Sequence, residues 1–344
     1  MTVRIALDAM GGDHAPQAVV EGAVCAAGRN PSAHFLLVGI QEVIERELSR
    51  LRADRRQFTV HTASQVVEMD EKPSVALRNK KDSSMRVGAN LVHQGDADAF
   101  VSSGNTGALM AISRFVLKTL PGIDRPAIAS WLPSITGQTM MLDAGANVDC
   151  SVEHLLQFAL MGYIYASVVL GVDRPRIGLL NIGSEEMKGN EVVRQTGEKL
   201  RELFLSYVGN VEGRDIFSGK VDVVVCDGFV GNVSLKTAEG VAQMLSHFLQ
   251  EAFRQSLLAR VGYVLAYRAF RYFRSRVDHR KYNGALLLGL NGLVIKSHGS
   301  ADAYAYAQAV QLAVNLAGSR MNERIRNEAA NLLAVVKPVV APSS

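Results

Sequence analysis

Two glycine-rich segments of this chain have a composition typical of an anion-binding turn. They read DAMGGDHAP over residues 8–16 and SSGNTGA over residues 102–108, and each separates an apolar run from a helical pattern. Glycines let the backbone approach a ligand closely, and the free N–H groups at a helix N-terminus attract negative charge. The residues that could surround anionic oxygens are Gly11, Gly12, Asp13, His14, Gly104, Asn105, Thr106 and Gly107.

Both turns also have a plainer interpretation. Asp13 is of a residue type that caps helices, so the first turn could be an ordinary connection between a strand and a helix. The second turn lacks the further glycine of a dinucleotide fingerprint and the Lys-Ser pair of a P-loop. A nucleotide site is therefore only weakly supported, while an anion site and a plain turn both stay open.

Four later segments are polar in the same way. They are LDAGAN (142–147), NIGSEEMKGN (181–190), CDGFVGN (226–232) and GLNGLVIKSHGS (289–300). Lys188 is next to a glycine, where a cation could reach a ligand, although a surface ion pair with Glu185 or Glu186 is the alternative. His298 lies in a loop, where functional residues concentrate, although a lone histidine is more often structural.

The elements that must position these segments alternate along the chain. Strands are expected at Val3–Asp8, Phe35–Val38, Phe58–His61, Ala99–Ser102, Met140–Asp143, Ile177–Asn181 and Val221–Asp227. Helices are expected at Gln17–Gly28, Ile40–Leu51, Ser84–Gln94 and Glu191–Leu205. This alternation predicts an α/β fold with a mainly parallel sheet and helices on both faces. Because ligands bind outside the carboxyl ends of such strands, function is expected at the polar turns.

The composition indicates an ordinary globular protein. Of 344 residues, 48% are hydrophobic and 20% are charged, with a net charge of +4. Cys25, Cys150 and Cys226 have no metal-type spacing and cannot all be paired, which favours a reducing compartment. Cys226 ends an apolar run and is interpreted as a buried structural thiol rather than a nucleophile.

One uncharged stretch raises the question of a membrane span. Residues 155–172 contain no charged side chain and approach the length that crosses a bilayer. Gln157, Gly162 and Ser167 interrupt the stretch, and a charged segment and another strand follow at once. We therefore interpret it as a helix buried in the core or in a subunit interface.

Taken together, the six polar segments resemble the acyl-acyl-carrier-protein:phosphate acyltransferases, the PlsX family. DAMGGDHAP, SSGNTGA, LDAGAN, NIGSEEMKGN, CDGFVGN and KSHGSADA occur in the family's order and cover the chain from Ile5 to about Ala313. The segment from Val241 to Tyr282 is not matched. The resemblance implies a Rossmann-like three-layer fold, related to phosphate acetyltransferase and isocitrate dehydrogenase. It also implies a homodimer with its active site near the subunit interface.

The expected organisation is a single acyltransferase domain over residues 1–333. A helical basic segment is expected within it at about 241–282, and a frayed C-terminal tail is expected at 334–344.

The reaction that the resemblance implies is the transfer of an acyl group from acyl-carrier protein to inorganic phosphate, giving an acyl phosphate for phospholipid synthesis. Phosphate is charged near neutral pH, and a pantetheine thiol with a pKa of about 8.5 leaves without strong acid help. Positioning and electrostatic support are then the main requirements, with no metal or other cofactor. Lys188 is expected to contact the phosphate or the carbonyl oxygen, and Asn232 to orient that oxygen. Asn147 and His298 are expected to join the glycine-rich turns in binding substrate.

The stretch from Arg254 to Lys281 is basic and aromatic. It contains Arg260, Arg268, Arg271, Arg274, Arg276 and Arg280, together with Tyr263, Tyr267, Phe270 and Phe273. Such a segment can lie on an anionic membrane or receive an acidic carrier protein. Packing against the dimer mate is the alternative. The protein is expected in the cytoplasm, either free or peripheral on the inner face of the membrane, where it could contact a membrane glycerol-3-phosphate acyltransferase.

Two functions of other classes compete with this one. A nicotinamide-dependent dehydrogenase could use a related fold, but the chain lacks a good dinucleotide fingerprint. A non-enzymatic membrane scaffold would explain the arginines but not the six polar turns. Nucleic-acid binding is not expected, because basic charge alone is a weak signal.

Overall fold

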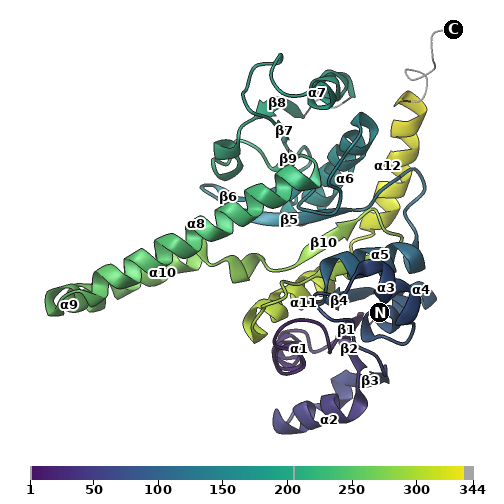
Figure 1. Cartoon of the computed structure of the whole chain (residues 1–344), viewed down its shortest axis with the longest axis vertical. Helices are drawn as coiled ribbons and strands as arrows, with labels where there is room; N and C mark the ends of the chain where they lie inside the picture. The colour runs from purple at the N-terminus through teal and green to yellow at the C-terminus, as the bar shows by residue number, and fades with distance from the viewer. Residues whose placement is uncertain (1, 204–205, 337–344) are drawn as a thin grey trace.

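A computed structural model gives the fold and describes residues 2–203 and 206–336 (Figure 1). One sheet of eleven strands has the order β3-β2-β1-β4-β11-β10-β5-β6-β9-β7-β8. The strands are β1 (Arg4–Asp8), β2 (His34–Gly39), β3 (Phe58–Thr62), β4 (Ala99–Ser102), β5 (Ala127–Ser134), β6 (Gly137–Leu142), β7 (Ile177–Leu180), β8 (Tyr207–Val211), β9 (Val223–Val225), β10 (Ala285–Leu288) and β11 (Leu293–Lys296).

The α-helices connect and cover these strands. They are α1 (Gln17–Arg29), α2 (Gln41–Arg50), α3 (Pro73–Asn79), α4 (Ser84–Gln94), α5 (Thr106–Leu117), α6 (Val152–Leu170), α7 (Glu191–Leu203), α8 (Gly228–Arg254), α9 (Leu257–Leu265), α10 (Tyr267–Val277), α11 (Ala303–Ala317) and α12 (Met321–Val336). Short 3-10 turns are η1 (Arg55–Gln57), η2 (Gly213–Phe217) and η3 (His279–Tyr282).

The sheet is mainly parallel and has helices on both faces, as predicted. Alternate residues of β1 show the two faces, because Ile5 and Leu7 pack in one core cluster with α1 and α11, whereas Ala6 packs in another with α4 and α5. The pairs β11·β10, β10·β5 and β5·β6 are antiparallel and lie in the middle of the sheet. The α/β class with a mainly parallel sheet is confirmed.

The predicted elements and the observed ones agree best where a buried parallel strand meets an amphipathic helix. The expected strand at Phe58–His61 and the expected helix at Ser84–Gln94 match β3 and α4 to within one residue. The expected strand at Val221–Asp227 is shorter, because only Val223–Val225 pairs with its neighbours. Strands β5, β8, β10 and β11 were not predicted.

The uncharged helix α6 belongs to the core. It is the one helix of the described residues that is long and apolar enough to cross a membrane. Of its most apolar 18-residue stretch, 67% is buried inside the fold. Tyr165 is fully buried and accepts a hydrogen bond from the Trp131 indole N–H at 3.2 Å. The interpretation as a buried helix fits this position.

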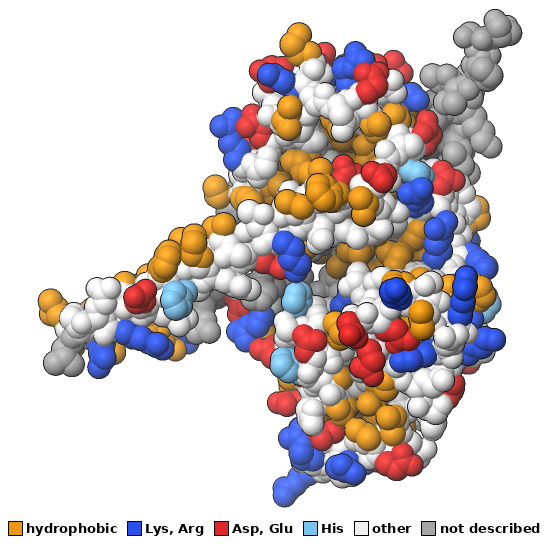
Figure 2. All heavy atoms as spheres, viewed as in Figure 1, with side chains coloured by type: hydrophobic (Ala, Val, Ile, Leu, Met, Phe, Trp, Pro, Cys, Tyr) orange, Lys and Arg blue, Asp and Glu red, His pale blue; other side chains and the backbone are white. Residues whose placement is uncertain are grey.

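A helical arm extends from the body of the molecule (Figure 1). It consists of the outer part of α8 together with α9 and α10, which is where the helical basic segment was expected. In Figure 2, hydrophobic side chains follow one edge of the arm and Lys and Arg side chains follow the opposite edge. The tail expected at 334–344 begins inside α12, which continues to Val336, and residues 337–344 lie outside the described residues.

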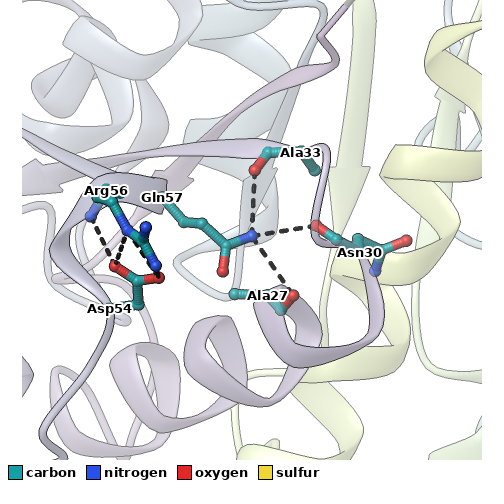
Figure 3. A network of polar contacts seen from close by, with 6 residues as sticks. All are labelled: Ala27, Asn30, Ala33, Asp54, Arg56 and Gln57. Atoms are coloured by element: carbon teal, nitrogen blue, oxygen red, sulfur yellow. Dashed lines mark hydrogen bonds and ion pairs between the residues drawn. The ribbon is translucent and has the colours of Figure 1, made fainter.

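The edge of the sheet at β3 is tied to α1 by one amide side chain (Figure 3). The Gln57 amide donates to the carbonyl of Asn30 at 3.1 Å and lies 3.4 and 3.5 Å from the carbonyls of Ala33 and Ala27. The backbone N–H groups of Asn30 and Ala33 already donate to the Ala27 and Asn30 carbonyls, so this amide adds a further donor at the end of α1. Beside it, Asp54 and Arg56 form an exposed ion pair at 2.8 Å.

Replacing Gln57 by Leu should lower the free energy of unfolding by about 1 kcal/mol, because the hydrogen bonds from the Gln57 amide to these carbonyls are lost. Urea titration followed by circular dichroism measures the change. Arg56→Ala is the matched control and should leave the midpoint unchanged, since its ion pair is solvated. Equal midpoints for Gln57→Leu and the wild type would contradict this role of Gln57.

Candidate active site

The turns that follow β1, β4 and β11 meet at one edge of the sheet, because these three strands are parallel neighbours. The Asp13 N–H donates to the Gly299 carbonyl at 2.9 Å. Gly12 has a φ of 103° and packs on Ser103, where a Cβ on Gly12 would lie 2.8 Å from the Ser103 Cβ. The segments 8–16, 102–108 and 296–300 therefore form one continuous polar surface.

A buried carboxylate, Asp8, holds two of these turns in shape. It accepts a hydrogen bond from the Ser102 hydroxyl at 2.6 Å and from the Met10 N–H at 3.2 Å. The Ser102 oxygen in turn accepts from the Gly104 N–H at 3.1 Å. Burial raises the pKa of Asp8, and the hydrogen bonds oppose this rise. Gly11 fits here because a Cβ would lie 2.8 Å from the Gly104 nitrogen.

Asn105 has a structural position in the second turn. Its side-chain oxygen accepts from the Ala108 N–H at 2.9 Å, which caps α5. Its amide donates to the carbonyls of Met69 and Glu71 at 2.8 and 3.0 Å. The amide is thus fully engaged, whereas the N–H groups of residues 106 and 107 have no acceptor within the described chain.

A second buried carboxylate, Asp143, shapes the turn 142–147. It accepts from the backbone N–H groups of Ile128 at 2.9 Å and of Asn147 at 2.7 Å, and from the Asn147 amide at 2.9 Å. Burial raises the pKa of Asp143 against these hydrogen bonds. The Asn147 amide also donates to the Pro126 carbonyl at 2.8 Å. Asn147, predicted to bind substrate, uses both of its amide hydrogens to hold this turn.

The start of α8 packs directly on that turn. Gly231 is buried there, and a Cβ in its place would overlap the carbonyl oxygen of Asp143. The next residue, Asn232, lies beside Gly145, where a Cβ on Gly145 would be 3.3 Å from the Asn232 Cβ. The Asn232 amide has no hydrogen bond to another described residue, so its donor and acceptor groups are available to a ligand.

These elements line a cavity of about 540 Å³ between α8 and the polar edge of the sheet. Its apolar wall includes Ile128, Trp131, Leu132, Pro133 and Leu235. Its polar wall includes Asp13, Thr106, Asn232, Lys236, Lys296 and His298. The predicted residues Gly11, Gly12, His14, Gly104, Asn105, Gly107 and Asn147 are not on the cavity wall, although most of them shape the turns behind it. An amphipathic cavity of this kind can hold an anion next to an apolar chain.

Two lysines of this cavity were missed by the sequence-based prediction. Lys296 ends β11 and is 9% exposed; its ammonium donates to the Ser103 carbonyl at 3.1 Å and to the Ser297 carbonyl. Burial lowers the pKa of Lys296 to about 8. Lys236 lies one helical turn after Asn232 and pairs with Glu239 at 2.7 Å. Their positions in the sequence could have indicated them. Lys296 stands at the end of a strand, and Lys236 follows Asn232 by four residues, which is one helical turn.

Lys188 lies elsewhere. It is exposed, and its side chain packs over Gly183 within the turn 181–190. Glu186, one of the two glutamates considered as an ion-pair partner of Lys188, pairs with Arg201 at 2.8 Å. Lys188 has no ion pair with another described residue. Neighbours of Lys188 line a second cavity of about 260 Å³, which also contacts Val230 and Ser234 of α8. The first turns of α8 thus separate the two cavities.

The cysteine and histidine candidates have structural partners. Cys226 is buried, its thiol lies 3.6 Å from the Asp143 carbonyl oxygen, and burial raises its pKa well above the usual value. A thiol held in its neutral form is a poor nucleophile. His298 shares a hydrogen bond with the Ser300 hydroxyl at 2.9 Å and faces the cavity. Among the described residues, no group of three or more His, Cys, Asp or Glu side chains could hold a metal ion.

Comparison with known proteins identifies the family. A family model described as fatty acid synthesis protein matches residues 3–324. The chain is 60% identical over 340 residues to a protein of Magnetococcus marinus called phosphate acyltransferase, covering 97% of each chain. It is 57% identical over 326 residues to a protein of the same name from Paraburkholderia xenovorans, covering 94% of this chain and 89% of the relative. The chain therefore belongs to the fatty acid synthesis protein family, as the sequence motifs predicted.

Solved structures show the same fold. A phosphotransacetylase from Streptococcus pyogenes has a TM-score of 0.61 at 17% identity, covering 92% of this chain and 94% of its own. The EutD phosphotransacetylase from Staphylococcus aureus has a TM-score of 0.56 at 15% identity and covers 94% of both chains. The predicted relation to the phosphate acetyltransferase fold is confirmed.

Replacing Gly231 by Ala should destabilise the site, because the added methyl group meets the Asp143 carbonyl. We expect a loss of about 3 kcal/mol in unfolding free energy and a fall in activity. Gly240→Ala in the same helix is the control, since a Cβ there would have no described atom within 4 Å outside its own stretch of helix, and alanine favours a helix. Thermal unfolding distinguishes the variants, and equal stability of the two would disprove the close packing.

Proposed function

We propose that this chain transfers a fatty acyl group from acyl-carrier protein to inorganic phosphate and releases an acyl phosphate. The observation that carries the proposal is the 540 Å³ cavity, which sets the donors of Lys296, Lys236 and Asn232 opposite an apolar wall. A phosphate needs hydrogen-bond donors and positive charge, and an acyl chain needs an apolar surface. One cavity supplies both.

The predicted enzyme class, a phosphate acyltransferase of fatty acid and phospholipid synthesis, is confirmed by the family match and by the names of the relatives. The two other functions considered, a nicotinamide-dependent dehydrogenase and a membrane scaffold, are not favoured. The relation to phosphotransacetylases in fold agrees with acyl transfer to phosphate, which their name describes.

In the proposed reaction, a phosphate oxygen attacks the thioester carbon. The bond between that carbon and sulfur breaks, and the thiolate leaves to take a proton from water. Negative charge develops on the carbonyl oxygen before the bond breaks, so a donor aimed at that oxygen lowers the barrier. Asn232 is the side chain that we assign to this oxygen, because it lines the cavity and its amide has no hydrogen-bond partner among the described residues.

Lys188 is assigned to the phosphate or to the same carbonyl oxygen, from the opposite side of α8. Its side chain is exposed and has no ion pair within the described residues, and its neighbours Gly189 and Asn190 line the 260 Å³ cavity together with Val230 and Ser234 of α8. A lysine has a flexible stem and can bring its charge to a ligand without a fixed hydrogen-bond geometry. Binding of the carrier protein across the turn 181–190 would bring this charge to the thioester.

Lys188→Ala should lower kcat by about 100-fold, as expected for the loss of one electrostatic contact in the transition state. Purified protein is supplied with phosphate and acyl-carrier protein, and acyl phosphate is trapped with hydroxylamine. The thermal unfolding midpoint should not change, because Lys188 is exposed.

Lys81→Ala is the control for that experiment, since Lys81 is exposed and is not among the lining residues of the two cavities. Near-normal turnover of Lys188→Ala would remove Lys188 from the mechanism. Absence of acyl phosphate with the wild-type protein would reject the function itself.

The arm supports two further parts of the proposal, a homodimer and a peripheral contact with the membrane. Five exposed apolar side chains of α8 are suited to pack on a second copy, namely Val233, Val241, Met244, Leu245 and Phe248. Toward the tip, Leu258, Val264 and Leu265 are exposed on the same arm as Arg260, Arg268 and Arg271. Apolar and cationic groups together favour an anionic lipid surface.

Flotation with vesicles of anionic lipid at low salt should recover the wild-type protein, and added salt should release it. The triple variant Arg260→Gln, Arg268→Gln, Arg271→Gln should stay unbound. The matched control changes Arg29, Arg46 and Arg52 of the body to Gln and should float like the wild type. If the wild-type protein does not float at low salt, the proposed membrane contact is wrong. The arm would then serve the dimer or the carrier protein.

A further inference from the structure

We infer that Lys296 and the N-terminus of α5 form a phosphate-group subsite in the 540 Å³ cavity. The inference rests on the proposed function and names a further ligand-contacting residue for it. The ligand is a phosphate dianion or monoester, which could be inorganic phosphate or the phosphate of a phosphopantetheine arm.

The first support is the incomplete bonding of a buried ammonium. Lys296 is 9% exposed, lines the cavity and carries three N–H donors, of which two reach the carbonyls of Ser103 and Ser297. It forms no ion pair with a described carboxylate. Asp8 and Asp13 act on this ammonium only at a distance, and a bound anion would add the direct contact that a buried charge needs.

The second support is a set of neighbouring donors that also lack acceptors. The Ser103 hydroxyl is fully buried and has no hydrogen-bond partner within the described chain. At the N-terminus of α5, the cap by Asn105 uses only the Ala108 N–H, which leaves those of Thr106 and Gly107 unpaired. Thr106 lines the same cavity as Lys296, whereas Ser103 and Gly107 are not among its lining residues. The Thr106 N–H and the Lys296 ammonium are therefore the donors that can converge on one anion.

The charges around Lys296 come from three elements. Asp8 at the end of β1 and Asp13 in the following turn favour its charged form, and Lys236 of α8 opposes it. His298 follows two residues later and also lines the cavity. Asp8 is tied to Ser102, and Lys236 is paired with Glu239. The Asp13 carboxylate is exposed, so water screens its repulsion of an anion.

The pKa of Lys296, lowered to about 8 by burial, gives this subsite a pH dependence. The ammonium is present below that pH and is lost as the pH rises through it. Inorganic phosphate is already a dianion above pH 8, so its own charge stays constant there. Phosphate affinity should therefore fall between pH 8 and pH 10 because of the protein.

The test is calorimetric titration of the full chain with inorganic phosphate, alongside the KM for phosphate. Lys296→Met should weaken phosphate binding by about tenfold to a hundredfold at pH 7.5, the usual cost of a lost hydrogen bond to a charged group. It should also flatten the fall in affinity from pH 8 to pH 10. Lys81→Met is the matched control and should keep both the wild-type affinity and its pH dependence.

Lys296→Gln serves as a second variant if Lys296→Met does not fold. The pH dependence of phosphate affinity in the wild type tests the subsite without any variant. Unchanged phosphate affinity in a folded Lys296 variant would overturn the subsite, and so would a wild-type affinity that is constant from pH 8 to pH 10. A structural role alone would lower the unfolding midpoint without changing this profile.

Two acyl donors identify the source of the phosphate group. If inorganic phosphate is bound, the Lys296→Met variant has a raised KM for phosphate and keeps the wild-type ratio of kcat/KM between acyl-phosphopantetheine and acyl-pantetheine. If the donor's phosphate is bound, the variant loses the preference of the wild type for acyl-phosphopantetheine. A wild-type protein that binds phosphate through Lys296 but makes no acyl phosphate would support the subsite and refute the proposed function.

Discussion

The polar edge of this sheet depends on two carboxylates that are almost completely removed from water. Asp8 is 1% exposed and Asp143 is 0% exposed, and each lies where a strand ends and a turn begins. Each is surrounded by N–H and O–H donors of its own turn and of a neighbouring strand or loop. Such carboxylates give glycine-rich segments a defined shape. If a turn changed its shape, a buried carboxylate would lose a hydrogen-bond donor, and that loss is costly. The cavity wall rests on these two turns.

Much of this arrangement could be read from the sequence. Buried parallel strands appear as short apolar runs, and polar turns after them indicate where a ligand binds. This reasoning located the turns that contain Asp13, Thr106, Asn232 and His298, all of which line the large cavity. It also predicted ligand roles for Asn105 and Asn147, whose amides donate to backbone carbonyls in the structure. Residue type and position cannot distinguish a side chain that binds a ligand from one that builds the loop, since both need the same hydrogen-bonding groups.

The apolar half of the cavity was beyond prediction. It comes from β5, which joins β6 and β10 in an antiparallel insertion at the centre of a parallel sheet. Long-range pairing of this kind leaves no local pattern, because β10 is contributed by a segment more than 150 residues after β5. Lys296 is hidden for a related reason. It stands at the end of an apolar strand, and its burial arises only when β4 and β10 close on both sides.

Helix α8 begins between the two cavities and continues outward into the arm. With 27 residues, it is about 40 Å long, and its buried end is held at Gly228 and Gly231. A helix held at one end can pivot about that end as a rigid rod. A small tilt imposed on the outer end by any surface would move Asn232 and Lys236 by a fraction of that displacement, and hydrogen-bond geometry responds to shifts of a few tenths of an ångström. A force on the outer end of α8 would therefore reach the two side chains that α8 contributes to the cavity.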